Sequence, residues 1–200
     1  MIIVAVTGSF AAGKSRTAGF FKKLGAGIFD ADEVSKKTAQ KGRPVYKAIV
    51  RLFGKEYLQK NGELDRKRLA RRVFAQPKDL RMLNTLIHPA VIMELFRTLK
   101  GLRHKKGMLV LDVPLLFESK MEKLVDVIVV VRSSQKNIFK RARLKGVRQD
   151  LAEKILSAQW PMKKKTDRAD FVLDNNGNLK ELEARVRRIY GQILKMENTI

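Results

Sequence analysis

The stretch from Gly8 to Ser15, GSFAAGKS, constrains this chain more than any other part of its sequence. It matches the pattern G-x-x-x-x-G-K-[ST], in which a glycine-bearing loop turns its backbone amides toward phosphate. The preceding residues 2–7 are apolar and mostly β-branched, which predicts a buried parallel strand. Residues 14–24 carry apolar side chains at helical spacing and predict a helix. Strand, loop and helix in this order are the context that the pattern requires.

The chemistry of this stretch favours binding of a nucleoside triphosphate. Gly8 and Gly13 free the backbone to curl, and the first turn of the helix offers unpaired N–H donors and a partial positive charge. We expect Lys14 to reach the β- and γ-phosphates and the Ser15 hydroxyl to hold Mg²⁺. The alternative is a glycine turn before a basic helix start, but the strand in front of the loop argues against it.

Length and composition set the broad class of the protein. The 200 residues suit one domain, or one core with an attached lobe. The absence of cysteine excludes disulfides and thiolate metal sites. No apolar run approaches the ~20 residues that span a bilayer, and a strand at the N-terminus leaves no room for a cleaved signal. We therefore expect a soluble, cytoplasmic protein without a membrane partner, either a monomer or a small homo-oligomer.

The charge of the chain is strongly positive. Lys and Arg number 43 against 20 acidic residues, a formal net charge of +23. Such a surplus suits nucleic acid, an acidic membrane face or a polyanionic small substrate. The basic residues are spread over many predicted helices, without a basic tail or an RNA-binding aromatic signature. We interpret most of them as solvated faces and expect no specific nucleic-acid partner, only weak binding at low salt.

A second predicted strand, residues 27–29, ends at two aspartates, Asp30 and Asp32. Ligands of open parallel sheets bind at the carboxyl ends of the strands, so we expect both carboxylates beside the phosphate loop. A kinase needs a carboxylate to orient and deprotonate its acceptor hydroxyl, and Asp32 is the candidate for that base. Asp30 and Glu33 also match a helix capping box. The two roles are compatible.

Residues 43–100 have a helical pattern that is too long for a simple crossover between strands. We expect a helical lobe here. It contains His88, directly before Pro89. A single histidine in a helix is commonly a packing or capping residue. A direct chemical role for His88 remains the alternative, and nothing nearby has metal-ligand spacing.

The second half of the chain supplies three more strands. Residues 108–113 predict a buried strand that ends near Asp112, typical of the strand-end aspartate that supports Mg²⁺, although a simple turn acid has the same pattern. Residues 125–131 predict a central strand and residues 169–175 a last one. Five strands alternating with helices predict an α/β fold with a doubly wound parallel sheet.

The helices between these strands have sequence signals for their first residues, and two of them are predicted to form a lid. Three further spacings match capping boxes: Ser119 with Glu122, Asp150 with Glu153, and Asn178 with Glu181. The basic helix 135–144 and the helix after it are expected to fold over ATP and to supply arginines to the phosphoryl group. Ordinary surface charge is the alternative. Trp160 is expected to pack at the hinge of this lid rather than to stack on a base.

Taken together, these residues resemble the dephospho-coenzyme A kinase family nearly from end to end. The motifs are the phosphate loop, FDAD at 29–32, FG at 53–54, GELDR at 62–66, LIHP at 86–89, DVPLLFE at 112–118, AQ at 158–159 and ADFVLDN at 169–175. The resemblance implies a P-loop NTPase-type core (1–42, 105–134 and 168–200), a helical substrate lobe (43–104) and a lid (135–167). It also implies Mg-ATP-dependent phosphorylation of the ribose 3′-hydroxyl of dephospho-coenzyme A.

The resemblance assigns roles to particular residues. Asp32 becomes the acceptor-orienting base, and Arg141 corresponds to the lid arginine that contacts the phosphates, together with Lys14. The implied ATP-binding residues are Gly8, Ala11, Ala12, Gly13, Lys14, Ser15 and Arg16. The implied acceptor-binding residues are Asp32, His88, Asp112, Pro114 and Leu115. Ser15 would hold Mg²⁺, with Asp112 behind it.

The chain also departs from the family pattern. The usual Gly-Ser-Gly-Lys-Ser-Thr is Ala-Ala-Gly-Lys-Ser-Arg at 11–16, so the loop loses a glycine, and Ala12 can serve if its φ is negative. A second lid arginine is replaced by Lys145, a point charge without a bidentate fork, for which Arg143 is a candidate substitute. The segment before Phe171, expected to be a loop, carries three consecutive lysines at 163–165.

Two other functions fit parts of the pattern. A nucleoside or nucleoside-monophosphate kinase would share the loop and the sheet. A nucleotide-dependent RNA-binding module would use the +23 charge and would bind RNA in a salt-resistant way.

Overall fold

The computed structural model describes residues 1–102 and 106–197, and this part of the chain forms two compact units. The first unit contains residues 1–30 and 106–197, and the second contains residues 31–102. The helical unit therefore begins at Ala31, whereas the sequence analysis assigned residues 31–42 to the core. The expected end of the lobe at residue 104 falls within 103–105, outside the described residues.

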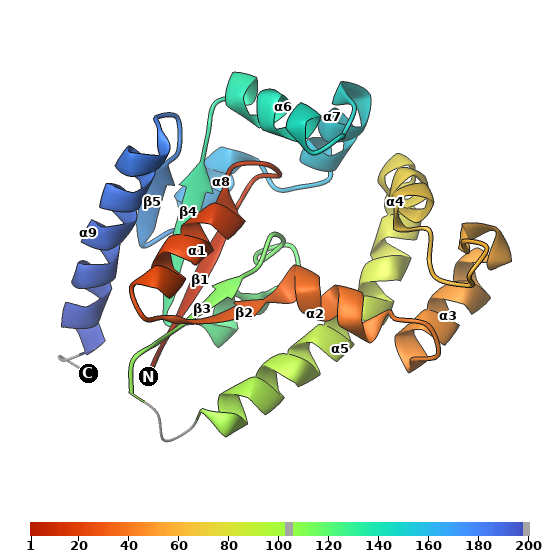
Figure 1. The fold of residues 1–200 in the computed structure, drawn as a ribbon, viewed down its shortest axis with the longest axis horizontal. Coiled ribbons are helices and arrows are strands. Elements are labelled where there is room, and N and C mark those ends of the chain that lie inside the picture. Colours follow the sequence, from red (N-terminus) through yellow and green to blue (C-terminus); the bar gives the residue numbers. More distant parts are fainter. Residues whose placement is uncertain (103–105, 198–200) are drawn as a thin grey trace. The chain divides into compact units, whose positions relative to one another are not determined.

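A parallel sheet forms the centre of the first unit. Its five described strands are β1 (Ile2–Gly8), β2 (Gly27–Asp30), β3 (Met108–Asp112), β4 (Val127–Arg132) and β5 (Phe171–Asp174). They lie in the order β2-β3-β1-β4-β5, and every neighbouring pair is parallel (Figure 1). The predicted α/β parallel sheet is confirmed. The strand expected to be central, β4, lies between β1 and β5, and β1 occupies the middle.

The register of the strands places Asp30, Asp112 and the start of the phosphate loop at one edge of the sheet. Asp112 at the end of β3 is paired with Asp30 on β2 and with Val6 on β1. On the other side of β1, Gly8 is paired with Val131. Because all the strands are parallel, their carboxyl ends share this edge. The loop after β1 therefore starts beside the ends of β3 and β4.

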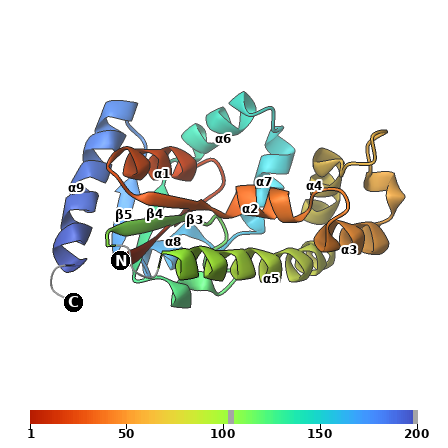
Figure 2. The same ribbon diagram turned by 60° about the horizontal axis from the view of Figure 1, so that its bottom comes forward.

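The core of the first unit forms because alternate strand residues face the same helices. Val4, Val110 and Val129 pack with Phe21 of α1 (Lys14–Lys23) and Val186 of α9 (Leu179–Glu197). Figure 2 shows α1 and α9 side by side. The residues between these valines, such as Ala5, Leu111 and Val130, are also buried. Burial on both faces explains the nearly continuous apolar strands in the sequence.

The remaining elements of the first unit test the predicted capping boxes. They are η2 (Met121–Leu124), α6 (Gln135–Leu144), α7 (Gln149–Ser157) and α8 (Met162–Thr166). The box before α9 is confirmed, since Asn178 Oδ1 accepts a hydrogen bond from the Glu181 amide at 3.0 Å.

The boxes predicted at Ser119 and at Asp150 are wrong. The residue before α7 is Arg148, and Asp150 lies in the first turn, where its carboxylate pairs with the Arg148 guanidinium at 2.7 Å. This ion pair holds the pKa of Asp150 at about 2. Ser119 donates its hydroxyl hydrogen bond back to the Leu115 carbonyl, and Lys120 precedes η2 in the left-handed conformation, with φ of 55°. In both places a closer partner satisfies the polar side chain, which therefore does not cap a helix.

The three-lysine segment is helical rather than a loop. It forms α8, in which Lys163 and Lys164 are exposed and Lys165 is fully buried. A buried lysine requires a charged or polar partner, and Lys165 Nζ lies 2.8 Å from Glu118 Oε1. This ion pair, which the sequence does not reveal, accounts for the burial of Lys165 in a run of otherwise exposed lysines.

The second unit is helical. It contains α2 (Ala31–Thr38), α3 (Pro44–Phe53), η1 (Lys55–Tyr57), α4 (Arg66–Ala75) and α5 (Pro77–Gly101). Ile49, Leu64, Leu69 and Val73 form its buried core. Asp65 caps α4 by accepting a hydrogen bond from the Arg68 amide at 2.9 Å. Among the described residues, no helix has the length and apolar character that crossing a membrane requires.

Candidate active site

Both glycines of the phosphate loop are required by their surroundings. Gly8 and Gly13 have φ of 145° and 108°, values that other residues rarely adopt. A Cβ on Gly8 would lie 2.1 Å from the Val131 carbonyl oxygen. A Cβ on Gly13 would lie 2.1 Å from Asn175 Nδ2. A side chain at Gly8 would therefore collide with β4, and one at Gly13 would collide with the Asn175 side chain.

The strained residue of the loop is Ala11. Its φ is 54°, whereas Ala12 lies outside the positive-φ region, as the sequence analysis required. The left-handed conformation of an alanine costs about 1–2 kcal/mol, so the surrounding structure must hold it. Ala11 and Phe10 pack into the apolar cluster of the α6–α7 hairpin, with Ile138, Ala142 and Ala152. The loop and the predicted lid therefore share one small core.

Two cationic side chains, Lys14 and Arg16, lie in the first turn of α1. Lys14 is buried, and its Nζ donates hydrogen bonds to the Ser9 carbonyl at 2.8 Å and the Gly8 carbonyl at 3.2 Å. Ser15 and Arg16 are exposed at the start of α1, whose first turn has no acidic residue. A helix that begins with positive side chains gains stability when an anion occupies its N-terminus.

Arg141 and Asn175 hold the loop through one carbonyl. Arg141 Nη1 donates to the Ala12 carbonyl and to Ser133 Oγ, both at 3.1 Å, and Nη2 donates to the Asn175 carbonyl at 2.8 Å. Asn175 Nδ2 donates to the same Ala12 carbonyl at 2.7 Å. Burial lowers the pKa of Arg141, although a guanidinium still keeps its charge at neutral pH. The structure thus brings the predicted lid arginine to the phosphate loop.

Sequence reasoning gave no role to Asn175, to Ser133 or to Gln159. Asn175 ends the ADFVLDN motif and Gln159 ends the AQ motif, so the resemblance had marked both positions without assigning them a task. Gln159 Oε1 accepts a hydrogen bond from the Phe10 amide at 2.9 Å. Contacts between residues about 150 positions apart have no local sequence signal.

Asp112 is buried at the end of β3, with 5% of its surface exposed. Next to it, Thr7 Oγ1 donates to the Pro114 carbonyl at 3.4 Å, and Pro114 and Leu115 are half-buried. Within the described ranges, no three His, Asp or Glu side chains gather into a metal site. The Ser15 hydroxyl, which the sequence analysis expected to hold Mg²⁺, is exposed at the start of α1. Mg²⁺ commonly binds through one or two protein ligands together with substrate phosphates and water.

Two of the predicted site residues belong to the second unit. Asp32 lies in the first turn of α2 with its side chain exposed. It follows Asp30, the last residue of β2, by two positions. His88 lies within α5, one residue before the internal proline, and is half-buried. Burial lowers the pKa of His88 below the ordinary value of 6.5.

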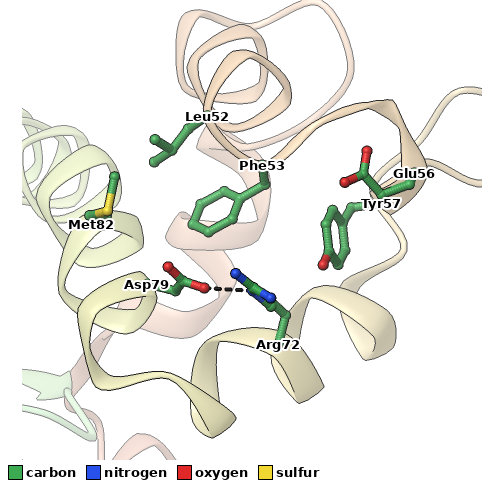
Figure 3. Close-up of a pocket in the computed structure, with 7 residues that line it drawn as sticks. All are labelled: Leu52, Phe53, Glu56, Tyr57, Arg72, Asp79 and Met82. Carbon is green, nitrogen blue, oxygen red and sulfur yellow. Dashed lines mark hydrogen bonds and ion pairs between the residues drawn. The ribbon is translucent and has the colours of Figure 1, made fainter.

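The second unit also contains a cavity of about 190 Å³. Its lining combines apolar and polar side chains: Leu52, Phe53, Glu56, Tyr57, Arg72, Asp79 and Met82 (Figure 3). Arg72 Nε and Asp79 Oδ2 form an ion pair at 2.6 Å at one side of the cavity. His88 is outside this lining. The arginine of this cavity is already paired with a carboxylate.

Comparison with known proteins extends over nearly the whole chain. The family model described as dephospho-CoA kinase matches residues 2–181. A protein of Enterococcus faecalis named dephospho-CoA kinase is 34% identical over 187 residues, covering 93% of this chain and 94% of the relative. A solved Thermus thermophilus structure superimposes with a TM-score of 0.78 at 29% identity, covering 96% and 97% of the two chains. A shikimate kinase from Acinetobacter baumannii shares the fold, with a TM-score of 0.56 at 14% identity over 98% of this chain and 94% of that one.

Proposed function

The chain belongs to the dephospho-CoA kinase family and is an ATP-dependent kinase of coenzyme A biosynthesis, and we propose that it phosphorylates the ribose 3′-hydroxyl of dephospho-coenzyme A. The observation that supports this most is the phosphate loop itself. Its two positive-φ glycines lie beside Lys14 at the carboxyl edge of the sheet. We further propose that the enzyme acts in the cytoplasm, where its ATP is available.

The proposed reaction is an in-line phosphoryl transfer. Asp32 accepts the proton of the 3′-hydroxyl, and the oxygen forms a bond to the γ-phosphorus while the bond to the β–γ bridging oxygen breaks. ADP leaves with the electron pair of that bond on its β-phosphate oxygen. Lys14 neutralises the β- and γ-phosphates, and the amides of the loop and of the first turn of α1 hold the remaining oxygens. Arg141 acts from the lid, where the guanidinium N–H groups that do not bind protein atoms are available to the phosphates.

Mg²⁺ would be held by the Ser15 hydroxyl together with phosphate oxygens. When bound, the ion neutralises charge that develops on the transferring group. Asp112 is proposed to stand behind this position, because its strand ends beside β1. The protein's own part is to hold the triphosphate still and to exclude water, since phosphoryl transfer depends mainly on positioning and charge neutralisation.

The helical second unit is proposed to bind the acceptor. The arm of dephospho-coenzyme A carries amides between short apolar segments, and the cavity next to the Arg72–Asp79 pair presents both kinds of surface. Leu52→Trp tests this, because Leu52 is 38% exposed and a larger side chain there would fill the cavity without entering the core. The KM for dephospho-coenzyme A should rise while the KM for ATP stays unchanged. If the KM for dephospho-coenzyme A in the variant equals that of wild type, the cavity does not take part in acceptor binding.

The acceptor itself is tested by direct competition of substrates. Transfer of labelled phosphate from ATP is measured with dephospho-coenzyme A, AMP, CMP and shikimate under the same conditions. We expect transfer to dephospho-coenzyme A alone, at the ribose 3′ position. Preferential transfer to a nucleoside monophosphate or to shikimate would contradict the proposal.

A further inference from the structure

Gln159 and Trp160 connect two segments that are distant in sequence. Gln159 follows Ala158, the C-cap of α7, and its Oε1 accepts the hydrogen bond of the Phe10 amide at 2.9 Å. The next residue, Trp160, donates its backbone amide to Glu118 Oε1 at 2.7 Å. Two consecutive residues thus bind the phosphate loop on one side and the segment after β3 on the other.

The Glu118 end of this connection is firmly held. Lys165 Nζ lies 2.8 Å from the same carboxylate oxygen, and the lysine is fully buried. The Trp160 ring stacks on Phe117, with centroids 5.6 Å apart and planes at 9°. The Trp160 amide and the Lys165 ammonium thus both contact Glu118 Oε1, and removing one partner of a buried ion pair is strongly destabilising. The peptide between Gln159 and Trp160 therefore has a defined position.

The Phe10 end bears on the conformation of the loop. Gln159 accepts a hydrogen bond from the amide of Phe10. Phe10 directly precedes Ala11, the strained position with φ of 54°. A strained residue persists only where its surroundings determine the backbone on each side. Ala12 is held by Arg141 and Asn175, and on the other side Gln159 holds Phe10.

We propose that Gln159 is a positioning residue for the phosphate loop, and that the Glu118–Lys165 ion pair fixes the peptide that carries it. Gln159 does not touch the reacting groups. It keeps Phe10 and Ala11 in the conformation that turns the following amides toward the triphosphate. This inference rests on the proposed binding of ATP by the loop.

The test is Gln159→Leu, which keeps the size of the side chain and removes the acceptor. ATP binding by calorimetry should weaken about five- to tenfold, the effect of one hydrogen bond lost to a partly buried amide. The KM for ATP should rise by the same factor, while the KM for dephospho-coenzyme A and the turnover at saturation stay near wild type. Hydrogen exchange at the Phe10 amide should accelerate.

Two further variants sharpen the result. Gln159→Asn keeps the amide but is one methylene too short to reach Phe10, so it should lose as much ATP affinity as Gln159→Leu. Gln149→Leu is the matched control at the first residue of α7, because Gln149 is exposed and donates a hydrogen bond to the exposed Glu153, and this variant should bind ATP as wild type does. The fluorescence of Trp160, the single tryptophan of the chain, reports whether the Glu118 end stays intact.

The outcomes separate this inference from the proposed function. If wild type itself does not bind ATP, the proposed function fails. If wild type binds ATP and both Gln159 variants bind ATP with the affinity of wild type, the positioning role of Gln159 is wrong, while the proposed function stands. A rise in both KM values together, with altered Trp160 fluorescence, would show a general structural role and would also overturn the inference.

Discussion

The side-chain amide of Asn175 and the backbone carbonyl of Ala12 are joined by a hydrogen bond of 2.7 Å across 163 positions of sequence. The same amide nitrogen occupies the space that a side chain on Gly13 would need. Asn175 is buried at the end of β5. One residue therefore both anchors the phosphate loop to the sheet and determines that the loop position next to it is glycine.

Asn175→Asp is expected to weaken both folding and ATP binding. It replaces an N–H donor with a carboxylate oxygen that faces a carbonyl, and it leaves that carbonyl with one partner fewer. The cost should be about 1–3 kcal/mol in the free energy of unfolding, measured by urea denaturation, with a parallel loss of ATP affinity. Asn176→Asp is the control, because the Asn176 side-chain oxygen only accepts hydrogen bonds, from Ser133, Ser134 and Asn137. Equal stability of the two variants would argue against the anchor.

Asp32→Asn is expected to lower turnover by at least about 10²-fold, the range for loss of a general base. ATP affinity should stay near wild type, since the amide keeps the size of the carboxylate. The control is Glu33→Gln on the same helical turn. The ion pair between Glu33 and Lys37 is exposed and contributes little to stability. Steady-state kinetics with both substrates, together with calorimetry for ATP, measures the effect. Near-normal turnover of the Asn variant would remove Asp32 from the mechanism.

The Glu118–Lys165 pair should show strong coupling in a double-mutant cycle. Lys165→Met removes the cation from Glu118, whose side chain is only 13% exposed. Glu118→Gln removes the anion from Lys165, whose ammonium is fully buried. Each single change should cost about 3–5 kcal/mol, whereas the double variant should unfold within about 1 kcal/mol of wild type. The glutamine oxygen can still accept the Trp160 amide hydrogen bond. Additive losses in the double variant would show that the two charges act independently.

His88 should make stability depend on pH below neutrality. Burial lowers its pKa in the folded chain, so the unfolded chain binds the proton more readily as the pH falls through the ordinary value of 6.5. The free energy of unfolding should therefore decrease from about pH 7.5 to about pH 5. In His88→Gln this decrease should be smaller, whatever the change in absolute stability. Urea denaturation at both pH values measures the slope, and identical slopes would mean that His88 does not titrate differently in the two states.

The sequence by itself determined the sheet and the chemistry of its first loop. β-branched apolar runs such as residues 2–7 and 127–131 favour buried parallel strands, and G-x-x-x-x-G-K-S after the first of them predicts a phosphate site there. The capping box before α9 was also predictable, because Asn178 and Glu181 are three residues apart and meet within one turn.

Only the tertiary structure decided how that loop is held. Arg141, Gln159 and Asn175 reach it from elements 129 to 163 positions away, and spacing along a chain gives no information about such meetings. The same holds for Lys165, which lies in a run of three lysines and differs from the other two only because Glu118 is placed beside it by the fold. Local patterns determine elements because their interactions lie within a few residues. Long-range hydrogen bonds and buried charges are determined by the packing of those elements.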